Sequence, residues 1–178
     1  VISAHPELFI AEILTAYSND ALLIEQALQF VPNIVVIGDI AKYANVKKAL
    51  EGKPIKVFAG AEALEQVAGM DCYDFMMAGI VGFAGLKPTL TAVRNGKTIG
   101  LANKETLVVA GDIVMREAKE NKANIIPVDS EHSAIFQCLV GEEHNPIEKI
   151  ILTASGGPFL GKKPNFLVNV KRAHALQH

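Results

Sequence analysis

The chain has 178 residues, half of them hydrophobic, and its 17 basic and 19 acidic side chains leave a formal charge of −2. This composition suffices for one full domain, or for one domain and part of another. The lack of a basic stripe argues against a nucleic-acid partner, and the longest apolar runs are too short for a membrane span. Cys72 and Cys138 have neither metal nor redox spacing, so we expect free thiols in a reducing cytoplasm.

Short apolar runs alternate with amphipathic stretches through residues 1–128. The expected strands are Leu8–Thr15, Asn33–Ile37, Ile55–Phe58, Tyr73–Ala78, Thr98–Ala102 and Ala123–Val128. The expected helices are Asp20–Phe30, Asp39–Leu50, Ala61–Ala68, Leu86–Arg94 and Lys104–Asn121. The alternation predicts an α/β protein with a Rossmann-like, doubly wound and mostly parallel sheet that has helices on both faces.

The rhythm changes after residue 140, where a polar loop precedes an expected strand, Ile147–Thr153, and one short helix, Phe166–His178. This tail is too small to fold alone, so we expect it to begin a second, α+β domain. The predicted division is therefore residues 1–128 for the sheet domain and residues 129–178 for the start of the next domain.

Two carboxylates, Asp129 and Glu131, stand two residues apart directly after the last expected strand. Alternate side chains of an extended chain point the same way, and open α/β sheets bind ligands at the carboxyl ends of their strands. One hypothesis is that both carboxylates bind Mg²⁺ or Mn²⁺, which prefer oxygen ligands. The alternative is that Asp129 or Ser130 caps the following helix, with Glu131 in its first turn.

Three further stretches have both a functional and a structural interpretation. Gly79–Gly85 could hold an anion on backbone N–H groups, but its G-x-x-G-x-x-G spacing favours a tight crossing of helix and sheet. Asn103 and Lys104 follow the next strand, where they could bind ligands or could be a helix cap and a solvated lysine. Residues 153–158 either bind a phosphate or form a turn that ends a strand.

These stretches together resemble one family, the 1-deoxy-D-xylulose 5-phosphate reductoisomerases. The matching segments are Gly79-Ile-Val-Gly-Phe-Ala-Gly-Leu-Lys-Pro-Thr, Leu101-Ala-Asn-Lys-Glu-Thr-Leu-Val, Pro127-Val-Asp-Ser-Glu-His-Ser-Ala-Ile-Phe-Gln and Leu152-Thr-Ala-Ser-Gly-Gly-Pro-Phe. They occur in the order of the family, and the last two are highly specific. The resemblance extends over essentially the whole chain.

The resemblance implies an early reaction of the non-mevalonate route to isoprenoids. The enzyme would rearrange 1-deoxy-D-xylulose 5-phosphate and reduce the product with NADPH to 2-C-methyl-D-erythritol 4-phosphate. A divalent cation, Mn²⁺ or Mg²⁺ and by extension Co²⁺, would polarise the substrate carbonyl. The complete enzyme is expected to be a cytoplasmic homodimer with a phosphosugar substrate and with neither nucleic acid nor membrane as a partner.

The resemblance also implies roles for individual residues. The expected metal ligands are Asp129 and Glu131, which form the catalytic set together with Lys104. The expected substrate contacts are Lys104, Ser130, Glu131, Ser155 and His178. The expected NADPH contacts are Ser18, Asn19, Asn103 and Glu105.

The chain departs from the family pattern at Ser18, where many members have a Lys that meets the 2′-phosphate of NADPH. We expect weaker selectivity for NADPH over NADH unless a nearby basic side chain replaces that Lys. The family's first strand with its G-x-T-G-S-I-G turn, its third carboxylate ligand, its lid and its C-terminal helical domain are not among these residues. We therefore expect these residues alone to be inactive.

Two other interpretations stay open beside the reductoisomerase. One is a Mg²⁺-dependent phosphosugar enzyme on a generic Rossmann-like fold, which would not need NADPH. The other is a non-catalytic Rossmann-like binding module, against which a longer reading frame would argue.

Overall fold

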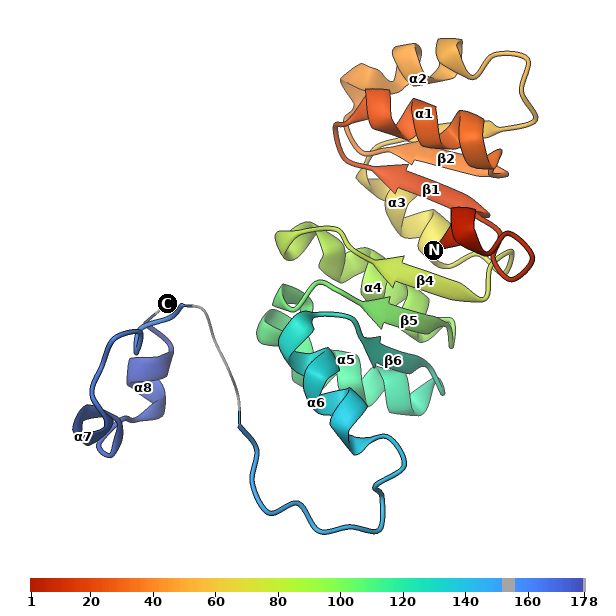
Figure 1. Cartoon of the computed structure of the whole chain (residues 1–178). Helices are drawn as coiled ribbons and strands as arrows, with labels where there is room; N and C mark the ends of the chain where they lie inside the picture. Colours follow the sequence, from red (N-terminus) through yellow and green to blue (C-terminus); the bar gives the residue numbers. More distant parts are fainter. Residues whose placement is uncertain (152–155, 178) are drawn as a thin grey trace. The chain divides into compact units, whose positions relative to one another are not determined.

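A computed structural model describes residues 1–151 and 156–177 (Figure 1). The chain divides into two compact units, Val1–Asp129 and Ser130–His178. The first unit contains the α/β alternation expected from the sequence. Among the helices in the described ranges, none has both the length and the hydrophobicity needed to cross a bilayer.

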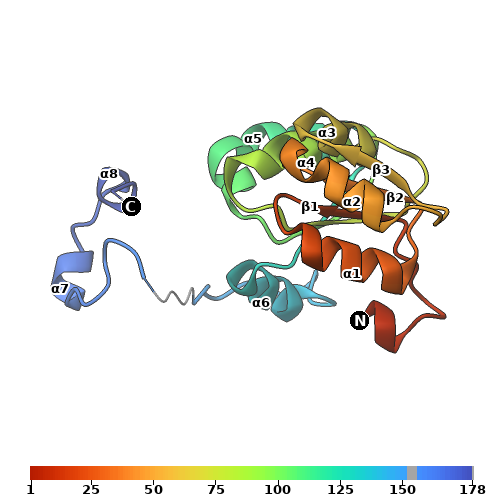
Figure 2. The ribbon, with the colours of Figure 1, turned by 90° about the horizontal axis from the view of Figure 1, so that it is seen from above.

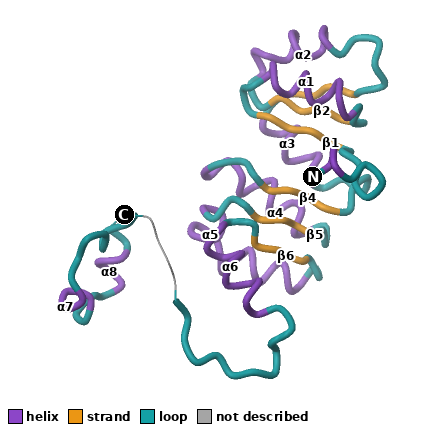
Figure 3. The backbone as a smooth tube through the Cα atoms, viewed as in Figure 1, coloured by secondary structure: helices purple, strands orange, loops and turns teal. Residues whose placement is uncertain are grey.

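The strands of the first unit are short and parallel. They are β1 (Ile13–Ala16), β2 (Ile34–Ile37), β3 (Lys56–Ala59), β4 (Phe75–Ala78), β5 (Thr98–Leu101) and β6 (Asn124–Pro127). Hydrogen bonding divides them into two three-stranded sheets, ordered β1-β2-β3 and β4-β5-β6 (Figure 3). The parallel α/β class is thus confirmed, while the strands form two ladders where the sequence suggested one sheet.

The first strand begins later than expected, at Ile13 instead of Leu8. Backbone N–H groups of Leu8 and Phe9 donate to the His5 carbonyl at 3.1 and 3.2 Å, which holds this apolar run in a turn. Leu8 is accordingly 70% exposed. The hydrophobicity of this run did not predict that its first residues hydrogen-bond to His5, just before them in the chain.

The helices of the first unit are α1 (Asp20–Phe30), α2 (Tyr43–Ala49), α3 (Ala61–Ala68), α4 (Leu86–Arg94) and α5 (Glu105–Glu120), with short 3-10 helices η1 (Ile2–Ala4), η2 (Ile40–Lys42) and η3 (Gly82–Gly85). In Figure 2, α1 lies on one side of the strands, and α3, α4 and α5 lie on the other. Val35 and Ile37 of β2 pack with α1 and α2, whereas Val36 packs with α3. Because both faces of β2 are buried, its sequence is apolar without alternation.

The second unit contains α6 (Ser130–Leu139), α7 (Pro164–Leu167) and α8 (Arg172–Ala175). The strand expected from Ile147 is not formed over residues 147–151, whose apolar side chains at Ile147 and Ile150 are exposed. The single helix expected over Phe166–His178 is also wrong. Lys171 has an extended backbone, with φ −111° and ψ 161°, and separates α7 from α8.

An ion pair between α4 and α5 makes part of the stability depend on pH. Arg94 donates from Nε and Nη2 to the Glu117 carboxylate at 2.6 and 2.9 Å, and this hydrogen bonding holds the pKa of Glu117 below its ordinary value of 4.5. Because the folded-state pKa is lowered, the contribution is complete above the unfolded-state pKa and is lost as the pH falls through the folded-state value.

Glu117→Gln is therefore expected to lower the free energy of unfolding at neutral pH and to flatten its decline below pH 4.5. Urea denaturation of the intact protein at a series of pH values measures this. Glu120→Gln, an exposed site on the same helix, is the control. An unchanged pH dependence in the Glu117 variant would contradict the assignment.

Candidate functional site

The carboxyl ends of β4, β5 and β6 bring three loops to one edge of their sheet. β4 leads into Gly79–Gly85, β5 leads into Asn103 and Lys104, and β6 leads to Asp129. The parallel register aligns the last residues of the strands, which are Ala78, Leu101 and Pro127. This edge is where open α/β sheets place their ligands.

Lys104 and Asp129 form an ion pair at this edge. Lys104 Nζ lies 3.2 Å from Asp129 Oδ2, and the two side chains are 53% and 10% exposed. The structure thus brings together two residues that the sequence singled out in separate motifs. Their meeting follows from the adjacency of β5 and β6, which pair directly. The arrangement presents an accessible ammonium beside a largely covered carboxylate, which suits an anionic, oxygen-rich ligand.

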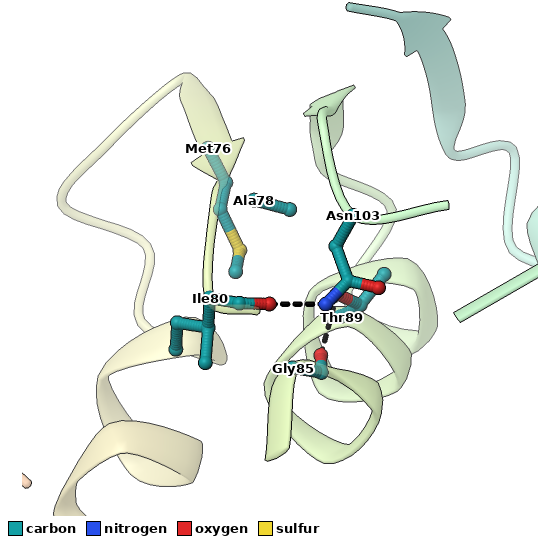
Figure 4. Close-up of a pocket in the computed structure, with 6 residues that line it drawn as sticks. All are labelled: Met76, Ala78, Ile80, Gly85, Thr89 and Asn103. Atoms are coloured by element: carbon teal, nitrogen blue, oxygen red, sulfur yellow. Dashed lines mark hydrogen bonds between the residues drawn. The ribbon is translucent and has the colours of Figure 1, made fainter. Parts of the chain in front are cut away.

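Asn103 is almost completely buried, with 3% of its surface exposed. Its Nδ2 donates to the backbone carbonyls of Ile80 and Gly82, the latter at 2.9 Å. Its Oδ1 accepts from Thr106 N at 2.8 Å and from Thr106 Oγ1 at 3.1 Å (Figure 4 shows the bond to Ile80). The bond from Thr106 N joins the Asn103 side chain to the first turn of α5, although Lys104 is the residue that directly precedes this helix.

The glycine-rich segment packs closely against Asn103. A Cβ added at Gly85 would lie 2.6 Å from the Ile80 carbonyl oxygen and 2.8 Å from Asn103 Nδ2. Thr89 Oγ1, which is buried, donates to the Gly85 carbonyl at 2.7 Å (Figure 4). The small pocket among these residues leaves no room for a water molecule. Gly85 therefore has the tight packing expected of a close crossing, whereas an added Cβ at Gly79 or Gly82 would meet nothing within 4 Å.

The loops after β1 and β2 adjoin each other in the first sheet. Asp39 N donates to the Tyr17 carbonyl at 2.7 Å, and Lys42 Nζ lies 3.4 Å from Asp20 Oδ1. A hydrogen bond from Asn45, together with Lys42, holds the pKa of Asp20 below its usual value. The sequence reasoning did not single out Lys42. The signal in the sequence that could have pointed to Lys42 as a ligand contact is its place in the loop after the buried strand β2.

Ser18 and Asn19 occupy the loop between β1 and α1, and both are exposed. Asn19 Oδ1 accepts from Leu22 N at 3.1 Å and so caps α1. Glu105 is partly exposed and lies in the first turn of α5. Ser155 and His178, two expected substrate contacts, lie outside the described residues.

In the second unit, Ser130 and Glu131 begin α6, where Ser130 Oγ donates to Glu131 Oε2 at 2.8 Å. Asp129 directly precedes this helix in the chain. The same residue is therefore the candidate for both the helix cap and the metal ligand. Over residues 1–151 and 156–177, no three His, Cys, Asp or Glu side chains are grouped closely enough to hold a metal. Carboxylate oxygens such as those of Asp129 and Glu131 are of the ligand type that hard divalent cations prefer.

Two family models match the chain. Residues 1–111 match the model described as 1-deoxy-D-xylulose 5-phosphate reductoisomerase, and residues 125–178 match that of the C-terminal domain of the same enzyme. The chain is 53% identical over its whole length to the 1-deoxy-D-xylulose 5-phosphate reductoisomerase of Bacteroides fragilis and 52% identical to that of Bacteroides thetaiotaomicron. It covers 46% of each, so it spans about half the length of these curated relatives.

Solved structures of the same enzyme are similar as well. The enzyme from Zymomonas mobilis in complex with NADPH superposes with a TM-score of 0.82 at 41% identity, covering 99% of this chain and 46% of that one. A DOX-P reductoisomerase in complex with NADPH, fosmidomycin and magnesium gives a TM-score of 0.81 at 36% identity, covering 100% of this chain and 46% of that one.

Proposed function

Because this chain belongs to the 1-deoxy-D-xylulose 5-phosphate reductoisomerase family, we propose that it is part of an enzyme that converts 1-deoxy-D-xylulose 5-phosphate to 2-C-methyl-D-erythritol 4-phosphate with NADPH and a divalent cation. The reaction would serve the non-mevalonate route to isoprenoids. The observation that supports this most directly is the pairing of Lys104 with Asp129 at the carboxyl edge of the β4–β6 sheet.

Asp129 and Glu131 would hold the cation, which is Mg²⁺ by analogy with the magnesium complex above and Mn²⁺ or Co²⁺ as alternatives. A bound cation of this kind polarises a carbonyl as a Lewis acid. Lys104 would bind the substrate and neutralise negative charge that develops on its oxygens, since its ammonium lies beside Asp129 and remains accessible. The other proposed substrate contacts are Ser130, Glu131, Ser155 and His178.

NADPH would bind along the carboxyl edges of both sheets. Ser18 and Asn19 lie in the loop that follows β1, and the segment Asn103–Glu105 follows β5. We accordingly propose residues 1–128 as the NADPH-binding domain and residues 129–178 as the beginning of the catalytic domain. The compact unit Val1–Asp129 supports a boundary near this point.

The proposed setting is a cytoplasmic homodimer. Cys72 and Cys138 are both exposed and free, which fits a reducing compartment. On α5, Val108 and Val109 are 81% and 59% exposed, and such apolar surface suits burial against a second copy. Light scattering on the intact protein would measure its oligomeric state.

The assay that tests the function uses the intact protein with 1-deoxy-D-xylulose 5-phosphate, NADPH and either Mg²⁺ or Mn²⁺. We expect NADPH oxidation that depends on both the substrate and the cation, with 2-C-methyl-D-erythritol 4-phosphate identified by mass spectrometry. Consumption of the substrate without NADPH oxidation would instead support a phosphosugar enzyme of another class. Binding of ligands without turnover would support a non-catalytic module.

We propose that Lys42 contacts the 2′-phosphate of NADPH, in place of the Lys that the family places at Ser18. Lys42 lies beside the N-terminus of α1, close to the Ser18–Asn19 loop, and its side chain is 45% exposed. A hydrogen bond between charged groups contributes roughly 1.5–3 kcal/mol. Lys42→Met is therefore expected to lower the ratio of kcat/KM for NADPH over NADH by about tenfold or more.

Lys48→Met, in α2 directly after η2, is the control that removes a cation elsewhere. Ser18→Lys added to the Lys42→Met variant should restore the ratio, because it returns a cation to the loop. A ratio unchanged by Lys42→Met would exclude this lysine from the phosphate contact, and an increase with Ser18→Lys alone would then assign the weak selectivity to Ser18.

A further inference from the structure

We propose that Asn103 is a positioning residue that locks the glycine-rich turn after β4 to the segment that carries Lys104. We propose this role in place of the NADPH contact expected of Asn103, so its side chain would not hydrogen-bond to the cofactor. The proposal rests on the proposed function, because it concerns the same edge of the same sheet. It is carried by the hydrogen bonds of Asn103, by the close packing of Gly85 and by the position of Lys104 in the chain.

The amide of Asn103 has its full set of partners inside the protein. An Asn side chain offers two N–H donors and an oxygen with two lone pairs. Both donors go to the turn, at Ile80 and Gly82, and both lone pairs go to Thr106. The reverse orientation of the amide would set its oxygen against two carbonyl oxygens, so the network fixes the orientation. A bond to NADPH would leave a buried partner unmatched, which is costly.

The packing of Gly85 supports the lock independently of the hydrogen bonds. Gly85 has φ −75° and ψ −15°, which any residue adopts, so its backbone does not require glycine. Space does, because a Cβ there would approach Ile80 O and Asn103 Nδ2 to less than 3 Å. Gly79, at the start of the same turn, has nothing within 4 Å of an added Cβ. Close approach is thus confined to the part of the turn that faces Asn103.

The lock has a consequence for the site because Lys104 is the next residue in the chain. Asn103 joins the loop after β4 to the first turn of α5, and Lys104 joins that segment to Asp129 after β6. The three loops at the carboxyl edge are therefore connected in series. Releasing the turn is expected to leave Lys104 less well placed, which affects both cofactor binding and turnover.

Asn103→Asp is the informative substitution, because it keeps the size and the acceptor for Thr106 but replaces the two donors with a carboxylate oxygen that repels the carbonyls. Hydrogen exchange of the ligand-free intact protein should show the backbone amides of residues 79–86 exchanging about tenfold faster or more. The amides of β5 should stay protected. In the assay, kcat/KM for NADPH should fall about tenfold to a hundredfold.

Gly85→Ala tests the same lock from its other side and should also accelerate exchange over residues 79–86, whereas Gly79→Ala should not. Thr106→Val, which removes only the hydroxyl partner of Oδ1, should leave exchange in the turn unchanged. If Asn103→Asp weakens NADPH binding while exchange in the ligand-free turn stays at the wild-type rate, Asn103 is a direct contact and the proposal is wrong. A wild-type protein without NADPH turnover would overturn the proposed function alone, since exchange needs no activity.

Discussion

Asp129→Asn in the intact protein is expected to lower kcat by about a thousandfold or more and to weaken binding of Mg²⁺ or Mn²⁺. The neutral amide is a poorer ligand for a hard cation than a carboxylate. Asn caps helices as well as Asp does, so the beginning of α6 at Ser130 should be preserved. The substitution therefore separates the two roles that the sequence left open for Asp129.

Isothermal titration with Mn²⁺ and steady-state kinetics measure the two effects, and thermal unfolding reports whether the fold is intact. Asp112→Asn, at an exposed position in α5, controls for the loss of a negative charge. Near-normal kcat in the Asp129 variant, with unchanged affinity for the cation, would remove Asp129 from the metal site and leave it as a helix cap.

Local signals were enough to predict several helices to the residue. The observed bounds of α1, α3 and α4 are those expected from the sequence. Each has a start or stop that depends only on its neighbours, such as the Asn19 cap of α1 and the Asn95-Gly96 stop after α4. Parallel strands followed from the same alternation, because helices of this length connect strands that run in one direction.

Pairing between distant segments was less predictable. The run from Leu8 is as apolar as a strand, yet its first half turns back on His5. The segment Ile147–Ile151 has three isoleucines beside two charged residues and is not a strand in the described part of the tail. Hydrophobicity reports that a segment can be buried, but it does not specify a partner.

The site was predictable to the extent that it depends on strand order. Lys104 and Asp129 each follow a strand, and parallel neighbours place such residues at one edge, so their ion pair agrees with the sequence reasoning. The lock around Asn103 was not predictable in the same way. Its acceptors are backbone carbonyls of another loop, and every residue has a carbonyl, so the sequence carries no mark of which ones converge.

Lys104→Gln is expected to lower kcat/KM for 1-deoxy-D-xylulose 5-phosphate by roughly a hundredfold or more, because it removes the ammonium proposed to bind and neutralise the substrate. The same change should leave the affinity for Mn²⁺ unchanged or higher. The ammonium lies 3.2 Å from Asp129 Oδ2, where it competes with a second cation for that carboxylate. Lys104→Gln and Asp129→Asn break the same ion pair, so a loss of metal affinity in the Asp129 variant alone would assign Asp129 to the metal and Lys104 to the substrate.

Lys104→Arg is the matched variant that keeps the charge, and it should retain more activity than Lys104→Gln while lacking the compact geometry of an ammonium. Lys119→Gln, exposed in α5, is the control for net charge. Kinetics at saturating NADPH and cation give kcat/KM, and titration with Mn²⁺ in the absence of substrate gives the metal affinity. A Lys104→Gln enzyme with unaltered kcat/KM would show that this lysine is the solvated residue of the structural interpretation. A parallel loss of metal affinity would show that it supports the position of Asp129 instead of binding the substrate.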